Sequence, residues 1–220
     1  MKRRWFIIFQ VGKQYKINKA VLSAIRAKGE LIMGYSTDFT GRFEFNKPVA
    51  EELKNYIDKF CETRRMTRDV EKIKEIYPNW KELCFNGNLG RDGEYFIGGD
   101  GFMGQSHDSS IINYNYAPAS QPGLWCQWVI NGDYLEWDGG EKFYNYIEWL
   151  EYLIEHFFNP LGYVLNGDIT WQGEDSDDCG TICVKDNVVD VKYGIHVYST
   201  EDIETEVLIE ELERRGYKVS

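Results

Sequence analysis

Carboxylates are the residues of this chain whose type and spacing could do chemistry. The segment Glu174–Asp178 holds four of them in five positions, and Asp168 lies six residues before it. Two carboxylates held close together can act as general acid and base, or can hold a divalent cation that activates water. If the protein is an enzyme, we therefore expect a carboxylate- or metal-dependent hydrolase, and its candidate catalytic residues are Asp168, Glu174, Asp175 and His107.

Motifs that would identify such an activity are missing from the sequence. None of the three histidines lies in HExxH, no serine lies in GxSxG, and the acidic segment lacks the glycine and the distant glutamate of a calcium loop. GxGxxG spacing is also absent, although residues 86–104 are rich in glycine. We therefore expect no resident metal and no cofactor, and the sequence favours a protein that is not an enzyme.

The same carboxylates could instead form a surface for a partner. A helix is predicted over residues 141–159, and three of its glutamates are spaced to lie on one side, opposite an apolar side. A solvated helix face and a charged, soluble loop are the simpler interpretation of both features. As a binding surface, both suit a basic protein. The candidate partner-binding residues are Glu148, Glu151, Glu155, Glu174, Asp175, Asp177, Asp178, Trp125 and Trp171.

Tryptophan is concentrated in the same part of the chain, where residues 121–178 hold five of the seven. Side chains alternate in direction along a strand, so these rings are expected on both faces of the predicted sheet. One face packs on the helix, and the other needs a cover, a ligand or a partner. A small-molecule-binding sink, with its ligand between the rings and the glycine-rich segment, is therefore a further alternative, and a homodimer is a reasonable expectation.

Charge is divided unevenly along the chain, whose net charge is −11. Residues 1–75 carry +7 and residues 76–220 carry −18. The negative part opposes nucleic acid, which could bind only through the basic N-terminal region, whereas the negative part suits a host protein with a basic surface. The alternative interpretation of this charge division is that the two regions are solvated surfaces of opposite charge that have no function.

Composition indicates a folded protein that crosses no membrane. Hydrophobic residues make up 43% and aromatic residues 15% of the 220 positions, which is enough for a core. No run approaches the roughly 18 apolar residues of a membrane span, and the apolar run at 5–11 is too short for a signal peptide. Five cysteines without CxxC spacing predict free thiols. We expect a cytoplasmic protein.

Hydrophobic spacing and turn residues predict an α+β fold, with antiparallel sheets, packed helices and a C-terminal ββαββ module. The predicted strands are 5–11, 31–35, 42–45, 107–116, 124–130, 134–137, 163–172, 180–184, 188–193 and 195–198. The predicted helices are 17–28, 49–64, 68–77, 141–159 and 201–215. A turn-rich link joins 31–35 to 42–45, and Asn131-Gly132 and Asp186-Asn187 are the predicted hairpin turns.

The expected organisation has three parts. Residues 1–85 form a basic α+β region, residues 86–104 a glycine-rich linker or loop, and residues 105–220 an acidic, aromatic-rich ββαββ module with a closing helix. The module carries the segments QPGLWCQW, EWDGGEKFYNYIEWLEYLI, GYVLNGDITWQGED and GTICVKDNVV. These segments, over about residues 106–191, resemble a set of uncharacterised proteins from phages, prophages and some bacteria. The resemblance implies a phage or prophage origin and brings no activity or site residue.

The sequence therefore predicts a non-enzymatic binding protein. It would act in the cytoplasm of a host cell and would engage and inhibit a defence or nucleic-acid-processing protein through its acidic, aromatic surface.

Overall fold

The computed structural model describes residues 14–15, 35–194 and 198–199. Contacts divide the chain into two units, Gly34–Tyr193 and a second made of Met1–Met33 with Gly194–Ser220. In the second unit, β1 (Gln14–Tyr15) pairs antiparallel with β10 (Tyr198–Ser199). The predicted strand at 5–11 and the predicted helices at 17–28 and 201–215 lie outside the described residues.

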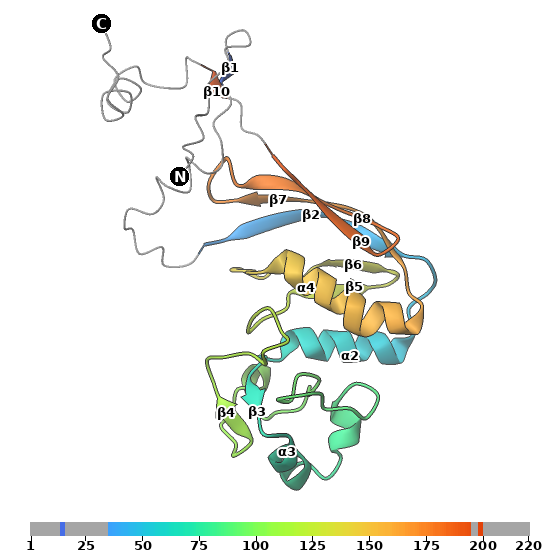
Figure 1. The fold of residues 1–220 in the computed structure, drawn as a ribbon, viewed down its shortest axis with the longest axis vertical. Helices are drawn as coiled ribbons and strands as arrows, with labels where there is room; N and C mark the ends of the chain where they lie inside the picture. The colour runs from blue at the N-terminus through green and yellow to red at the C-terminus, as the bar shows by residue number, and fades with distance from the viewer. Residues whose placement is uncertain (1–13, 16–34, 195–197, 200–220) are drawn as a thin grey trace, which may run out of the picture. The chain divides into compact units, whose positions relative to one another are not determined.

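A six-stranded antiparallel sheet is the centre of the unit Gly34–Tyr193 (Figure 1). Its strands, in spatial order, are β5 (Trp128–Asn131), β6 (Tyr134–Trp137), β2 (Thr37–Phe45), β7 (Leu165–Gly173), β8 (Cys179–Lys185) and β9 (Val188–Tyr193). Buried and exposed residues alternate along β2 and β7, so one face of the sheet is buried and the other is polar. This arrangement confirms the predicted α+β class.

The strand β2 differs most from the sequence prediction. The sequence predicts a turn-rich link before a short strand at 42–45, whereas β2 starts at Thr37 and pairs with β7 along its whole length. Asp38 and Gly41 are typical turn residues, but here Asp38 points to the polar face. Gly41 has a φ of 116°, and a Cβ there would press on the carbonyl of Asp168. Local composition therefore indicated a turn where pairing with β7 imposes a strand.

The position of β2 also changes the expected division of the chain. It lies between β6 and β7, so a strand from the first part of the sequence is inserted into the sheet of the later part. The glycine-rich residues 86–104 fall within the unit Gly34–Tyr193 and are packed, with Leu89 and Phe96 buried. They are not a linker between two domains.

Two helices cover the buried face of the sheet (Figure 1). The amphipathic α2 (Glu51–Glu62) faces the core with Leu53, Tyr56, Ile57, Phe60 and Cys61. The second helix, α4 (Tyr146–Leu153), continues into a π-helical turn, η3 (Ile154–Phe158), and a 3-10 turn, η4 (Asn159–Leu161). It completes the ββαββ module with β5, β6, β7 and β8.

The helix α4 begins at Tyr146 rather than at the predicted residue 141. Lys142 and Asn145 have φ values of 63° and 55°, which a right-handed helix cannot contain. Residues 141–145 therefore form a bent lead-in to the helix, and only the later part of the predicted helix is helical.

The two predicted hairpins are present. Asp186 and Asn187 both have positive φ, 50° and 65°, as a two-residue turn between β8 and β9 requires. In the other hairpin Asn131 pairs with Tyr134, so Gly132 and Asp133 form the turn, one position later than predicted.

The segment between α2 and β5 has little regular structure. It contains β3 (Thr67–Arg68), α3 (Val70–Ile76), η1 (Trp80–Leu83), η2 (Phe102–Gly104) and β4 (Ile111–Asn113). A small separate core of Ile73, Cys84, Leu89 and Phe96 holds it together. No helix in the described part of the chain combines the length and the apolar character of a membrane span.

Candidate partner-binding surface

The acidic loop, residues 174–178, connects β7 to β8 and is held by its own carboxylates and backbone. Asp178 accepts hydrogen bonds from the Tyr35 hydroxyl at 2.7 Å and from Trp171 Nε1 at 3.4 Å. Glu174 accepts one from the Ser36 amide at 2.8 Å, and the Gly173 amide donates to the Asp178 carbonyl at 2.7 Å. The loop is thus fixed against the start of β2 and the end of β7, which limits the entropy that a partner would have to remove.

Tyrosines gather next to this loop. Burial and the hydrogen bond to Asp178 raise the pKa of Tyr35 to about 12. Burial, and then the negative charge of Asp178, also raises the pKa of Tyr146, and Glu148 adds to this effect. The Tyr144 hydroxyl accepts a hydrogen bond from the Tyr35 amide at 3.3 Å, and the Tyr144 side chain is 54% exposed. The acidic loop and the first turn of α4 therefore form one acidic, tyrosine-rich surface.

The predicted acidic row continues along α4 and its π-helical turn. Glu148, Glu151 and Glu155 are all exposed, while Trp149, Leu150 and most of their neighbours are buried in the core. The π-helical turn changes the spacing after Leu153, yet Glu155 still points to solvent. Glu148, Glu151 and Glu155, together with the acidic loop, constitute the acidic surface.

The two predicted binding tryptophans are placed differently. Trp171 is only 2% exposed, so its ring is not available to contact a partner. The ring instead packs beneath the acidic loop and supports it. Gly180, its cross-strand neighbour, lies under the ring, and a Cβ there would overlap it. Trp125 is half-buried beside Arg64, whose guanidinium lies 5.5 Å from the ring centre, and it belongs to the irregular segment before β5.

The candidate catalytic residues do not come together. Asp168 lies on the polar face of β7, opposite Arg42 on β2 and Cys183 on β8. Glu174 follows the end of the same strand, so at about 3.3 Å per residue it lies roughly 20 Å along the strand from Asp168. A pair of carboxylates acting on one bond must be much closer, within about 10 Å. His107 is exposed on the loop after η2. The structure therefore gives no support to an Asp168–Glu174 pair.

Metal binding has no matching arrangement in the part of the chain that the structure describes. No group of three His, Cys, Asp or Glu side chains there is placed to hold an ion. The acidic loop uses Glu174 and Asp178 for hydrogen bonds within the protein.

Residues 35–193 carry 28 Asp and Glu against 14 Lys and Arg, a net charge of −14, so the unit as a whole is strongly acidic.

Sequence reasoning missed a buried polar cluster around Asp108. Arg68, 2% exposed, donates to the Asp108 carboxylate at 2.8 Å and to the Ser110 hydroxyl at 2.8 Å. The Tyr77 hydroxyl donates to Asp108 at 3.1 Å. Burial acts to raise the pKa of Asp108, but the hydrogen bonds from Ser110 and Arg68 outweigh it and lower the pKa. These four side chains use their polar groups to bond within the cluster. The cluster therefore holds α3, β3 and the loop before β4 together.

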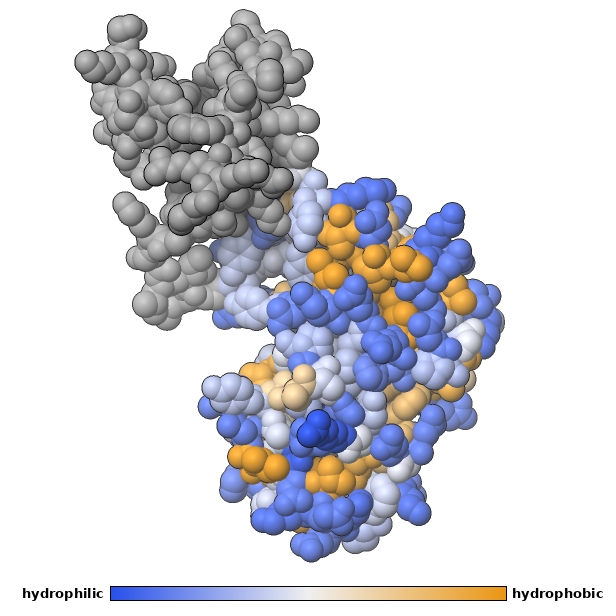
Figure 2. Space-filling model, in the orientation of Figure 1, coloured by the Kyte–Doolittle hydropathy of each residue, from blue (hydrophilic) through white to orange (hydrophobic). Residues whose placement is uncertain are grey.

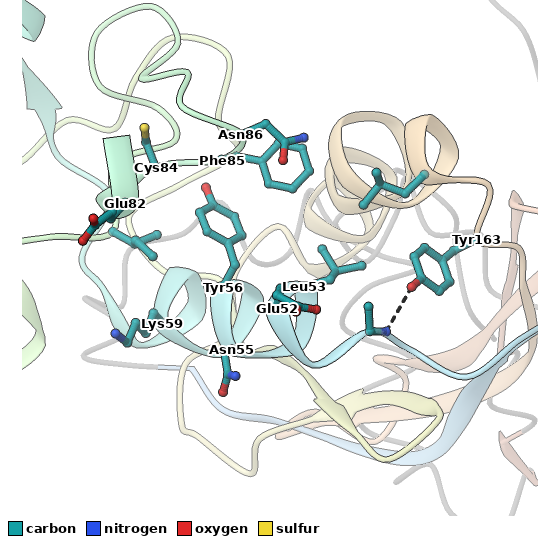
Figure 3. Close-up of a pocket in the computed structure, with 13 residues that line it drawn as sticks. Glu52, Leu53, Asn55, Tyr56, Lys59, Glu82, Cys84, Phe85, Asn86 and Tyr163 are labelled. Carbon is teal, nitrogen blue, oxygen red and sulfur yellow. Dashed lines mark hydrogen bonds between the residues drawn. The ribbon is translucent and has the colours of Figure 1, made fainter. Parts of the chain in front are cut away.

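A pocket of about 480 Å³ lies beside α2 (Figure 3). Its wall includes Leu53, Tyr56, Phe85, Ile97 and Leu161, and its rim includes Glu52, Lys59, Glu82 and Asn86. At one end the Tyr163 hydroxyl accepts a hydrogen bond from the Ala50 amide at 3.0 Å. No local sequence pattern indicates this pocket, because its lining comes from three distant segments.

Comparison with known proteins does not assign this surface or the pocket. The chain matches no protein-family model, no curated protein and no solved structure.

Proposed function

We propose that the protein is a non-enzymatic binding protein whose acidic surface engages a basic surface of another protein. One observation carries the proposal: the acidic loop is held by hydrogen bonds within the protein, the exposed Tyr144 is bonded to the same Tyr35 that holds the loop, and Glu148, Glu151 and Glu155 are exposed. Preordered side chains lose little entropy on binding, and tyrosines at such sites supply much of the binding energy. Electrostatic attraction from a unit of net charge −14 would accelerate encounter with a basic partner.

The resemblance of residues 106–191 to phage and prophage proteins supports a bacterial cell as the setting. Proteins that process nucleic acid, including those of defence systems, present basic surfaces to phosphate backbones. An acidic protein that occupies such a surface competes with the nucleic acid. The proposed role is therefore inhibition of a host protein of this class in the bacterial cytoplasm.

Quantitative capture from a nuclease-treated bacterial lysate tests the proposal. The wild type is compared with the triple variant E148K/E151K/E155K and with a matched control, E44K/E62K/E75K, which reverses three exposed glutamates on β2, α2 and α3. We expect the wild type and the control to enrich the same basic protein, and the α4 variant to capture about tenfold less of it. Equal capture by all three, or loss in the control as well, would overturn the proposal.

A second candidate function is supported by the pocket beside α2. Its apolar wall and charged rim suit a small molecule with an apolar body and a polar end, and its volume lies within the usual range for ligand sites. Native mass spectrometry of freshly purified protein would reveal a retained ligand as a constant added mass. Replacing Leu53 with Trp would fill the pocket and remove that mass, whereas Glu75→Lys would leave it.

A further inference from the structure

Cys61 and Cys126 lie where the irregular segment between α2 and β5 leaves the core and returns to it. Cys61 is in the last turn of α2. Cys126 precedes β5, and alternating burial places it on the same buried face as Trp128. Most of the segment between the two cysteines, residues 62–125, lies on the side of α2 that faces away from the sheet (Figure 1). The two cysteines therefore mark the ends of one large loop.

Two hydrogen bonds hold the ends of this loop side by side. The Cys61 thiol donates to the Trp128 carbonyl at 2.8 Å, and the Arg65 amide donates to the Leu124 carbonyl at 2.9 Å. The two stretches of chain thus run antiparallel, and Cys126 lies between the two bonded positions. Both cysteines are free thiols and belong to the same hydrophobic core. The fold therefore brings the two thiols together.

A buried positive charge lies beside the two thiols. Arg65 is 2% exposed, and its guanidinium donates to the Glu94 carbonyl and to the Gln121 side chain, so among the described residues it is hydrogen-bonded to no carboxylate. Burial, and then the neighbouring Cys126 thiol, raise the pKa of Cys61 well above its ordinary value, and the charge of Arg65 acts against both. The thiolate of Cys61 is scarce, but Arg65 stabilises it when it forms.

We propose that Cys61 and Cys126 are a redox-active pair that hydrogen peroxide oxidises to a disulfide. The Cys61 thiolate attacks the peroxide, so that an S–O bond forms and the O–O bond breaks. The released hydroxide takes the proton that Cys61 gave up and leaves as water. The Cys126 sulfur then attacks the Cys61 sulfenic acid, an S–S bond forms, the S–O bond breaks, and a second water leaves. Two thiols are oxidised, and one peroxide is reduced to two waters.

Only a small oxidant can reach this pair. Cys61 and Cys126 are 6% and 1% exposed, so both lie beneath the surface of the unit, which is mostly hydrophilic on the face that Figure 2 shows. Hydrogen peroxide is small and uncharged, and it can enter where a bulky disulfide reagent cannot. The reaction is slow, because burial restricts both access and the formation of the thiolate.

The disulfide would hold the whole irregular segment. Linking residues 61 and 126 closes a loop that contains β3, α3 and β4, and a cross-link across a long loop stabilises a protein by restricting its unfolded chain. The segment also supplies Phe85 and Ile97 to the wall of the pocket beside α2. Oxidation therefore makes the protein more resistant to unfolding and fixes that wall of the pocket.

Peptide mapping after peroxide treatment tests whether the pair forms. The wild type and the variant C179S/C183S, which lacks the two thiols that are not buried, are incubated with hydrogen peroxide and then alkylated. We expect the Cys61–Cys126 disulfide to be the main intramolecular link in both proteins. No reaction at Cys61, its oxidation to an unlinked sulfinic acid, or a link from Cys61 to Cys84 would each overturn the proposal.

Urea unfolding tests whether the link stabilises the segment. We expect peroxide to raise the urea midpoint of the wild type and of Cys179→Ser by roughly 1 M or more, and dithiothreitol to reverse the change. Cys61→Ser keeps a hydroxyl that can donate to the Trp128 carbonyl, so it should fold, and its midpoint should not rise with peroxide. Cys126→Ser is a second variant with the same expectation. A rise in either of these variants, or an unchanged midpoint in wild type that carries the disulfide, would contradict the proposal.

Discussion

The Arg68 guanidinium lies 2.8 Å from the Asp108 carboxylate, in the segment between α2 and β5, which has little regular structure. Arg68 also bonds to Ser110, and Tyr77 bonds to Asp108, so one charged pair connects β3, α3 and the loop before β4. Few backbone hydrogen bonds between strands stabilise this segment, so the buried side-chain network holds its backbone in place.

Replacing Asp108 with Ala should destabilise the protein strongly. The change leaves the Arg68 charge buried without a carboxylate, and removing one partner of a buried pair costs about 3–5 kcal/mol. Urea unfolding followed by fluorescence measures the loss. Asp108→Asn keeps part of the hydrogen bonding and should cost clearly less, so equal costs for the two variants would contradict this account.

The contribution of Asp108 should depend on pH. Its pKa is lowered in the folded protein, so its charge stabilises the fold fully above the ordinary pKa of about 3.9 and less as the pH falls through the folded value. The stability difference between wild type and Asp108→Asn should therefore be constant near neutral pH and shrink below about pH 4. A difference that stays constant in acid would mean that the ion pair is not formed.

Two fully buried tryptophans should respond differently to replacement by Phe. Trp128 Nε1 donates to the Tyr146 carbonyl at 2.8 Å, whereas Trp149 Nε1 has no hydrogen-bond partner among the described residues. Both substitutions remove similar volume, but only Trp128→Phe breaks a hydrogen bond. We expect it to cost about 1 kcal/mol more than Trp149→Phe in thermal or urea unfolding. Equal costs would indicate that Trp149 has a bound partner such as water.

Tyr35 should keep its proton in mild alkali. Its pKa is raised to about 12 by burial and by the hydrogen bond to Asp178, so its contribution to stability is complete below about pH 10 and is lost as the pH rises towards 12. NMR of labelled tyrosine rings, assigned with Tyr35→Phe, should find Tyr35 mostly protonated at about pH 11. Asp178→Asn should lower that pKa, and an unchanged value would show that the acidic loop is not held by Tyr35.

Features that depend on neighbouring residues could be predicted from the sequence. Asp186-Asn187 specifies its turn through two residues that tolerate positive φ. The apolar spacing of α2 and the exposure of Glu148 and Glu151 follow from helical periodicity.

Features that depend on pairing between distant residues could not be predicted from the sequence. The strand β2 contains Asp38 and Gly41, and only its pairing with β7, more than a hundred residues later, makes these positions extended. The burial of Trp171 depends on Gly180 across the strand pair, and the Arg68–Asp108 pair joins residues forty positions apart. No local pattern signals such contacts, because the interactions that stabilise them are tertiary.

Site-specific photo-crosslinking in bacterial cells shows whether the acidic surface contacts a basic protein. A photoreactive phenylalanine analogue is placed at Glu151 on α4 or, as the control, at Glu75 on α3; both positions are exposed. We expect a covalent adduct with a basic host protein from position 151 and none from position 75. No adduct from position 151, or the same adduct from both positions, would contradict this expectation.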